Sequence, residues 1–209
     1  MKKLILASAS PRRASLLQAL DIPFEIVPSN IDENLETVLS PPEHVHEIAK
    51  RKTQAVALQF PNALVLGADT VVALQDQIFE KPNDAQHAKE MLAQLSGKTH
   101  QVYTALILID TQTGNTETDV VATDVTMRAL SAHEISRYVD TGEPLDKAGA
   151  YGIQGRSSLF IESISGCFYN VVGLPLTAFS NLYQRLTDQS LWDVMPNSIS
   201  STDLISSNA

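Results

Sequence analysis

The sequence predicts a mixed α/β fold, with an elongated mixed sheet, flanking helices and a cleft between two lobes. Short apolar runs alternate with amphipathic helical segments through the first 95 residues, and long β segments joined by turn signals follow them. Residues 63–68 (ALVLGA) are apolar on both faces, which is typical of a strand at the centre of a sheet. A chain of 209 residues is long enough for one domain, or for two lobes that share a cleft.

The first part of the chain supplies the alternating elements. Ser10 and Pro11 have the residue types preferred at the N-cap and first position of a helix, and Pro41-Pro42 opens a longer one. The predicted elements, in chain order, are a strand at 3–8, a helix at 11–20, a strand at 24–27, a helix from 41 to about 60, and the central strand at 63–68. Asp69 would therefore follow the carboxyl end of that strand.

The second part is richer in hairpins. Gln75-Asp76 and Gly114-Asn115 are turn signals between β segments, Gly97 ends a helix and Ser131 caps another. The predicted elements are strands at 71–74 and 77–80, a helix at 84–95, strands at 99–110 and 116–130, a helix to 139, short strands at 160–164 and 167–172, and a final helix at 175–186. The segment 187–209 is polar and aperiodic over most of its length, so we expect a functional domain at 1–186 and a flexible C-terminal tail.

Composition narrows the class of protein. The net charge is −9, which argues against general affinity for nucleic acid. No stretch approaches the roughly 20 apolar residues of a membrane-spanning helix, and no signal peptide is evident. The single cysteine, Cys167, excludes an internal disulfide and a cysteine-based zinc site, and favours a reducing cytoplasm.

The positive charges are unevenly distributed. Seven of the fifteen Lys and Arg residues lie within the first 52 positions: Lys2, Lys3, Arg12, Arg13, Lys50, Arg51 and Lys52. A local basic cluster on an acidic protein suits a small anion better than a polymer. The alternative is a solvated surface patch, which is the common fate of exposed charges.

The segment Ser8-Ala9-Ser10-Pro11-Arg12-Arg13 is the first candidate for a site. A predicted strand ends here and a helix begins with two arginines in its first turn. Free N–H groups and the helix dipole make a helix N-terminus an anion site, and the arginine fork matches phosphate oxygens. Two cations at this end oppose the dipole, a cost that a bound anion would offset.

Further candidates follow later in the chain. Asp69, in Gly67-Ala68-Asp69-Thr70, is predicted at the sheet edge where open α/β proteins bind ligands, although a turn aspartate bonding its own backbone is the alternative. Glu33, Lys52 and Lys81 are further charges near predicted core segments, and each taken alone is more often a surface residue. Four of the nine glycines fall within residues 142–155, a segment that either walls a pocket or is an irregular loop.

The order of these motifs resembles the Maf family. Ser-Ala-Ser-Pro-Arg-Arg is similar to the family's opening motif, and Gly-Ala-Asp-Thr-Val-Val at 67–72 to its second. The remaining matches are Glu80-Lys81-Pro82, Leu95-Ser96-Gly97, His100-Gln101-Val102 with Thr104, the stretch 146–155, and Asn-Val-Val-Gly-Leu-Pro-Leu at 170–176. The resemblance covers roughly residues 3–186 and leaves the tail outside.

The resemblance implies a nucleoside triphosphate pyrophosphatase with a fold similar to that of the inosine triphosphatase enzymes, a homodimer that depends on a divalent metal cation such as Mg²⁺ or Mn²⁺. It assigns the phosphates to Ser8, Arg12 and Arg13. Glu33 and Asp69 would hold the metal and the attacking water, with Asp69 as general base. Lys52 and Lys81 would neutralise charge on the phosphoryl group and the leaving pyrophosphate. These residue types fit a reaction that needs positioning and charge stabilisation, and carboxylate oxygens suit Mg²⁺.

The resemblance also indicates the substrate. Ala-Tyr-Gly-Ile-Gln-Gly at 150–155 is similar to the subgroup that acts on dTTP and UTP, and unlike relatives that prefer methylated guanosine triphosphate. Arg12, Thr70 and Gln154 fall at the positions which that subgroup uses to select its base. A Gln amide presents one acceptor and two donors, which can match the edge of a uracil or thymine ring.

Two other classes of function remain as alternatives. One is a nucleotide-binding regulator of septum formation or cell division with little turnover, a role to which the family has been linked. Such a regulator would not require the full set Glu33, Lys52, Asp69 and Lys81. The other is a protein that binds a phosphosugar or a coenzyme, which would need a different pocket wall from the segment around Gln154.

Overall fold

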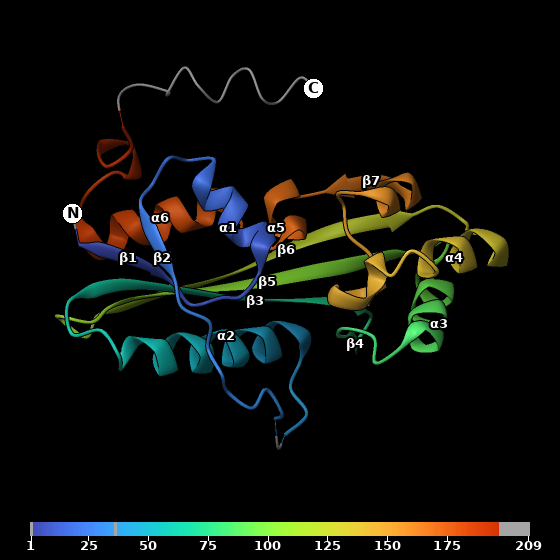
Figure 1. The fold of residues 1–209 in the computed structure, drawn as a ribbon, viewed down its shortest axis with the longest axis horizontal. Helices are drawn as coiled ribbons and strands as arrows, with labels where there is room; N and C mark the ends of the chain where they lie inside the picture. Colours follow the sequence, from blue (N-terminus) through green and yellow to red (C-terminus); the bar gives the residue numbers. More distant parts are fainter. Residues whose placement is uncertain (1, 36, 197–209) are drawn as a thin grey trace.

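A computed structural model describes residues 2–35 and 37–196 of the chain, and its centre is a mixed sheet (Figure 1). The strands are β1 Lys3–Leu6, β2 Phe24–Ile26, β3 Ala63–Leu74, β4 Gln77–Phe79, β5 Thr99–Asp110, β6 Thr116–Met127 and β7 Ile161–Ser165. Their order is β2-β1-β3-β5-β6-β7, and β4 pairs with β3. The α-helices are α1 Pro11–Gln18, α2 Pro41–Ala57, α3 Ala85–Leu95, α4 Ala132–Val139, α5 Phe168–Val172 and α6 Leu176–Thr187.

The sheet is parallel at one side and antiparallel at the other. β1 lies parallel to both β2 and β3, whereas β3, β5, β6 and β7 form an antiparallel series. The strands β3, β5 and β6 are each 12 residues long and run along the length of the molecule (Figure 1). The predicted mixed α/β fold with an elongated sheet is therefore confirmed.

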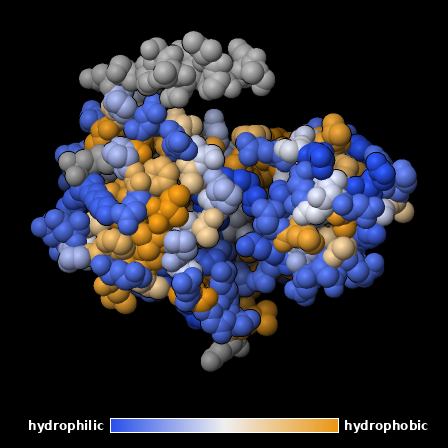
Figure 2. All heavy atoms as spheres, viewed as in Figure 1, coloured by the Kyte–Doolittle hydropathy of each residue, from blue (hydrophilic) through white to orange (hydrophobic). Residues whose placement is uncertain are grey.

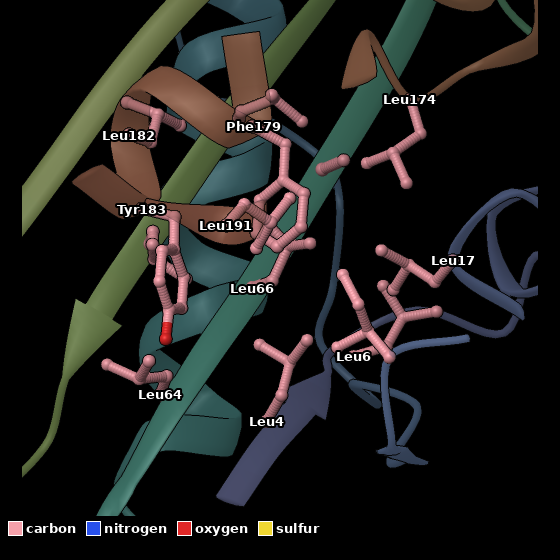
Figure 3. Packing of buried hydrophobic residues seen from close by; sticks show 14 of the residues in the cluster. Leu4, Leu6, Leu17, Leu64, Leu66, Leu174, Phe179, Leu182, Tyr183 and Leu191 are labelled. Atoms are coloured by element: carbon pink, nitrogen blue, oxygen red, sulfur yellow. The ribbon is translucent and has the colours of Figure 1, made fainter. Parts of the chain in front are cut away.

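The helices cover both faces of the sheet. Figure 1 shows α1 and α6 on one side of the long strands and α2 on the other. Because side chains alternate along a strand, Leu64 and Leu66 of β3 pack towards α1 and α6, and Val65 packs towards α2. Figure 3 shows the first of these clusters, in which Leu6 and Leu66 of the sheet meet Leu17 of α1 and Phe179 of α6.

A second core lies at the far end of the long strands. There α3 and α4 pack on β5 and β6, with Met91, Leu92, Val102 and Met127 among the buried residues. The chain then runs through the short 3₁₀ helices η1 Glu143–Asp146, η2 Ala148–Ala150 and η3 Arg156–Phe160 before β7. Each end of the sheet thus has its own core, and the two ends correspond to the two predicted lobes.

Local signals account for most helix boundaries. Pro11 and Pro41 stand in the first turns of α1 and α2, as the sequence predicts. Asp84 and Ser131 cap α3 and α4 through hydrogen bonds accepted from His87 N and Glu134 N. Among the residues that the structure describes, no helix is long and apolar enough to cross a membrane.

Two strand predictions are wrong. Residues 63–68 and 71–74 are parts of one strand, β3, so Asp69 lies within the strand instead of after its carboxyl end. The strand is continuous because β5 pairs with it from Leu64 to Ala73. Within the predicted strand 167–172, residues 168–172 form the helix α5, near whose ends stand Gly166 and Gly173, both with positive φ angles.

The chain after α6 begins as folded structure. The 3₁₀ helix η4 (Leu191–Asp193) places Leu191 in the core cluster of Figure 3, with Val194 and Met195 packed against that cluster. Trp192 is 78% exposed. Within the segment predicted as a flexible tail, Leu191 thus fills an apolar site of the core, and residues 197–209 lie outside the described part of the chain.

Candidate active site

A cavity of about 810 Å³ lies between the two ends of the sheet. Its walls come from the N-terminus of α1, the loop before α2, α2 itself, the middle of β3, the residues after β4 and the segment 146–154. The nine residues singled out from the sequence all line it: Ser8, Arg12, Arg13, Glu33, Lys52, Asp69, Thr70, Lys81 and Gln154. Figure 2 shows the surface hollowed between the two halves of the molecule.

The cavity lies at a gap in the strand pairing of β3. β5 occupies one edge of β3 along nearly its whole length. On the other edge, the pairing with β1 ends at Leu66 and the pairing with β4 begins at Val72. Within residues 2–35 and 37–196, no strand therefore pairs with 67–71 on that edge. The gap is also at the carboxyl ends of the parallel strands β1 and β2, where ligands bind in open α/β sheets.

Lys52 joins the two predicted carboxylates. Its Nζ lies 2.6 Å from Glu33 Oε2 and 2.8 Å from Asp69 Oδ1. The side chains of Lys52 and Asp69 are 14% and 13% exposed, whereas that of Glu33 is 57% exposed. The group thus has a sheltered pair, contributed by α2 and β3, and one accessible carboxylate from the loop after β2.

A close approach of helix to strand sets the position of Lys52. A Cβ atom on Gly67 would lie 1.8 Å from Oγ1 of Thr53, the residue next to Lys52 on α2. The absence of a side chain at Gly67 therefore lets α2 lie directly against β3. This contact brings Lys52 within reach of Asp69, two residues further along the strand.

Arg13 is buried and held by four protein groups. Its Nε donates to Gly173 O at 2.8 Å. Its Nη1 donates to Ser8 Oγ at 3.0 Å and to Ala68 O at 2.9 Å, and its Nη2 donates to Thr70 Oγ1 at 2.9 Å. Four of the five guanidinium hydrogens are thus used, and one on Nη2 has no partner among the described residues.

The acceptors of Arg13 are all neutral, so its charge has no contacting carboxylate within the described ranges. Burial lowers the pKa of Arg13, and the charge of Asp69 opposes that effect. Because a guanidinium stays protonated, the cost of burying its charge must be offset electrostatically. The N-terminus of α1 adds positive potential here, and the Ser10 side chain makes no capping hydrogen bond to it. Together these features favour a bound anion.

Thr70 belongs to the same network, on the opposite face of β3 from Asp69. Its Oγ1 accepts from Arg13 and lies 2.9 Å from Thr104 Oγ1, which in turn donates to Asn170 O. Since the Thr104 hydrogen goes to Asn170, Thr70 must donate to Thr104. The hydroxyl hydrogen of Thr70 is therefore already committed, and only its oxygen can address a ligand.

The remaining predicted residues stand on the rim. Arg12 Nη1 lies 2.9 Å from Asp146 Oδ2, across the cavity. Lys81 follows β4 and is exposed, and Gln154 is exposed in the segment between η2 and η3. The structure therefore brings all nine residues to one cavity. Two of them, Arg13 and Thr70, are already hydrogen-bonded to other groups of the protein.

The structure also gives contacts to residues that the sequence named only as parts of motifs, or did not name. Asp146 contacts both Arg12 and Lys147, and His44 of α2, which the sequence did not single out, lies 3.3 Å from Glu80. Asp146, Lys147, His44 and Glu80 all line the cavity. No sequence signal marks the Arg12 pair, because its two members are 134 positions apart.

Tyr151 lines the cavity and is hydrogen-bonded to His100 of β5. The Tyr151 hydroxyl lies 2.6 Å from His100 Nε2, and both side chains are buried. Burial lowers the pKa of His100 to about 4 and raises that of Tyr151. His100 is therefore neutral in the folded protein at physiological pH.

We expect this histidine to make the fold sensitive to acid. An unfolded histidine has a pKa near 6.5. As the pH falls from about 6.5 to about 4, the unfolded chain therefore binds a proton at this residue while the folded chain does not. The free energy of unfolding falls by an amount on the order of 3 kcal/mol once the pH is below both pKa values. His100→Gln should flatten the fall in melting temperature over this window relative to wild type. Equal slopes for the two proteins would show that His100 does not carry the effect.

The donor set fits a divalent metal cation. Glu33 and Asp69 both direct a carboxylate oxygen at the same ammonium nitrogen, so the two can address one positive charge. No group of three or more His, Cys, Asp or Glu residues suited to a metal occurs in the described part of the chain. Mg²⁺ is commonly held by one or two carboxylates and completes its shell with water and substrate phosphate oxygens.

Comparisons with known proteins identify the same family as the sequence motifs do. A dTTP/UTP pyrophosphatase of Desulforamulus reducens is 48% identical over 181 residues, which are 87% of this chain and 95% of the relative. A dTTP/UTP pyrophosphatase of Photorhabdus laumondii is 50% identical over 186 residues, 88% of this chain and 94% of the relative. Among solved structures, a HAM1 protein from Coxiella burnetii has a TM-score of 0.44 at 15% identity over 61% of this chain and 73% of that one, too distant a likeness to bear on function. The family described as Maf-like protein matches residues 3–186, and this chain therefore belongs to the Maf family.

Proposed function

We propose that the chain is a metal-dependent nucleoside triphosphate pyrophosphatase that hydrolyses dTTP and UTP to the nucleoside monophosphate and pyrophosphate. The observation that carries the proposal is the buried Arg13 charge with only neutral contacts, beside the group of Glu33, Lys52 and Asp69. An anion-binding site next to paired carboxylates suits phosphoryl transfer to water. The substrate is inferred from two relatives, each about half identical to this chain, that are dTTP/UTP pyrophosphatases.

The cationic residues bind and stabilise the phosphate chain in this proposal. The free Nη2 hydrogen of Arg13, the first-turn N–H groups of α1 and the guanidinium of Arg12 face the phosphate oxygens. Ser8 fixes Arg13 through its hydroxyl. Lys81, exposed on the rim, neutralises charge on the leaving pyrophosphate, and Lys52 does so at the phosphoryl group.

Asp69 is the proposed general base. Lys52 occupies Oδ1 of Asp69, so Oδ2 is the atom that takes the proton from the attacking water. Glu33, the more exposed carboxylate, shares the metal site with Asp69. When bound, a divalent cation neutralises phosphate oxygens and helps to orient the substrate. The sheltered position of Asp69 keeps the base and its ammonium partner in a fixed geometry.

Pyrophosphate release from a panel of nucleoside triphosphates tests this function. We expect the highest kcat/KM for dTTP and UTP, lower values for dCTP and GTP, and loss of activity in EDTA that added Mg²⁺ or Mn²⁺ restores. Full activity in EDTA would contradict the metal site. Tight binding of nucleotide without turnover would favour the regulator of septum formation instead.

Gln154 gives a sharper test of base choice. It lines the cavity in the segment after Tyr151, and its amide can pair with the donor and acceptor edge of a pyrimidine. Gln154→Ala should lower kcat/KM for dTTP and UTP by about 2- to 13-fold, the value of one hydrogen bond of about 0.5–1.5 kcal/mol. GTP should be affected less, so selectivity narrows. A uniform loss for all nucleotides would mean that Gln154 only braces the segment between Gly152 and Gly155.

The proposal includes a homodimer and a cytoplasmic location. The resemblance to the Maf family supports the homodimer, and a nucleoside triphosphate substrate is compatible with the cytoplasmic location. The one cysteine of the sequence, Cys167, is a free thiol in the structure, which is compatible with a reducing compartment. Sedimentation at micromolar protein concentration should give a mass near twice 22.8 kDa, and a monomer would contradict the dimer.

A further inference from the structure

The ion pair between Arg12 and Asp146 connects opposite walls of the cavity. Arg12 belongs to the first turn of α1, at the phosphate side. Asp146 is the last residue of η1, in the other lobe, and leads into the segment that contains Gln154. Arg12 Nη1 donates to Asp146 Oδ2 at 2.9 Å, and Nη2 reaches Asp146 O at 3.5 Å.

Asp146 holds a second cation with its other oxygen. Lys147 Nζ lies 2.7 Å from Asp146 Oδ1 and 2.5 Å from Glu143 O. Partial burial acts to raise the pKa of Asp146, but the hydrogen bonds from Lys147 and Arg12 outweigh it and hold the pKa below its usual value. The carboxylate is therefore charged at neutral pH and bridges the two cations.

Lys147 links Asp146 to the segment 147–154, which contains Gln154 and which we call the base-side segment. Its side chain is 13% exposed, and its Cδ and Cε atoms would both lie 3.2 Å from a Cβ atom on Gly152. The Lys147 stem thus passes directly over the backbone at Gly152, two residues before Gln154. A continuous series of contacts therefore runs from Arg12 through Asp146 and Lys147 to Gly152 in the base-side segment.

We propose that Asp146 is a positioning residue that fixes the phosphate-side helix α1 relative to the base-side segment 147–154. Its two contacts with Arg12 use Nη1 and Nη2 and leave other guanidinium hydrogens for the substrate. The pair therefore orients Arg12 for a ligand that must reach both walls at once. This inference rests on the proposed function, since a nucleoside triphosphate is such a ligand.

Steady-state kinetics of Asp146→Asn separate this role from a simple change of charge. Removing a negative charge from the cavity would by itself strengthen the binding of any polyphosphate. Loss of positioning should instead raise KM for dTTP by about fivefold, the scale of one partly exposed ion pair, with kcat within about twofold of wild type. Inhibition by inorganic tripolyphosphate, which has no base, should not weaken. Asp146→Glu should restore most of the affinity for dTTP, and Glu162→Gln, an exposed carboxylate away from the cavity, should behave as wild type.

Gly152→Ala provides a second variant that acts on the same series of contacts from its other end. The added methyl group lies 3.2 Å from Lys147 Cδ and Cε, so the Lys147 side chain must shift by a few tenths of an ångström. KM for dTTP should therefore rise, whereas inhibition by tripolyphosphate should stay unchanged. An unchanged or lower KM in both variants, or parallel weakening of dTTP and tripolyphosphate, would overturn the proposal. If the wild-type protein lacks turnover, the proposed function fails, and calorimetric affinities for dTTP and tripolyphosphate then test Asp146 independently.

Discussion

Asp69→Asn is expected to lower kcat for dTTP by about 10²- to 10⁴-fold, the usual contribution of a general base. The amide cannot take a proton from water, and it offers a metal no negative charge. Asn has nearly the same shape, and Lys52 keeps its contact with Glu33 at 2.6 Å, so the fold should survive. The measurement is single-turnover hydrolysis at saturating dTTP, with a thermal melt of each protein.

The matched control for this substitution is Glu162→Gln, which removes one exposed carboxylate outside the cavity. It should keep the kcat of wild type. If Asp69→Asn also keeps it, Asp69 serves structure only, and Glu33 becomes the candidate base. If Asp69→Asn melts well below wild type, the pair with Lys52 stabilises the fold as well as serving the reaction.

Gly67→Ala is expected to damage both stability and turnover. The new Cβ would lie 1.8 Å from Thr53 Oγ1 and 2.9 Å from Thr53 Cβ, so α2 must move away from β3. Overpacking of this kind typically costs about 1–3 kcal/mol of unfolding free energy. Lys52 moves with α2, and a shift of about 1 Å at a catalytic group can lower kcat by roughly 10²-fold. A chemical melt and dTTP kinetics measure the two effects.

A double substitution shows whether the clash is the cause. Thr53→Ala removes the oxygen that Gly67→Ala would strike, and costs the hydrogen bond from Thr53 Oγ1 to Ala49 O and the packing of the buried γ-methyl group. The double variant should recover part of the lost stability and of kcat, since the 2.9 Å contact with Cβ remains. If the effects of the two substitutions on stability and on kcat simply add, the clash with Thr53 is not the cause. The close approach of α2 to β3 would then not be what positions Lys52.

Local sequence signals predicted the elements well where one principle dominates. Proline at a first helical turn, the capping residue Ser131, and the turn at Gly114-Asn115 each act within a few residues. The prediction for β3 failed because its polar residues, Asp69 and Thr70, look like the end of a strand. They lie within the strand because β5 pairs with it throughout, and the gap on its other edge makes room for a ligand.

The segment 167–172 shows a different limit. Its apolar residues predict a strand, yet it forms the five-residue helix α5. The buried Asn170 side chain donates to Val102 O and to Thr123 Oγ1, at 2.9 Å each. These contacts join residues 68 and 47 positions apart, and tertiary contacts of this kind decide the conformation of so short a segment.

The candidate site was accessible from the sequence as a set of residues but not as an arrangement. Motifs shared with the Maf family supplied most of the predicted residues that line the cavity, and Glu33 and Lys52 were candidates outside the quoted motifs. The four hydrogen bonds that hold Arg13, and the pair between Arg12 and Asp146, depend on distances between segments that only the folded chain provides. The sequence therefore could not show that Arg13 has one hydrogen left for a ligand.

The products formed from dTTP test the central proposal most directly. Phosphorus NMR of a reaction with purified protein, Mg²⁺ and dTTP follows each phosphate species as it forms. Hydrolysis at the α–β bond predicts dTMP and pyrophosphate in equal amounts, with no dTDP at any time. The appearance of dTDP with orthophosphate would contradict it.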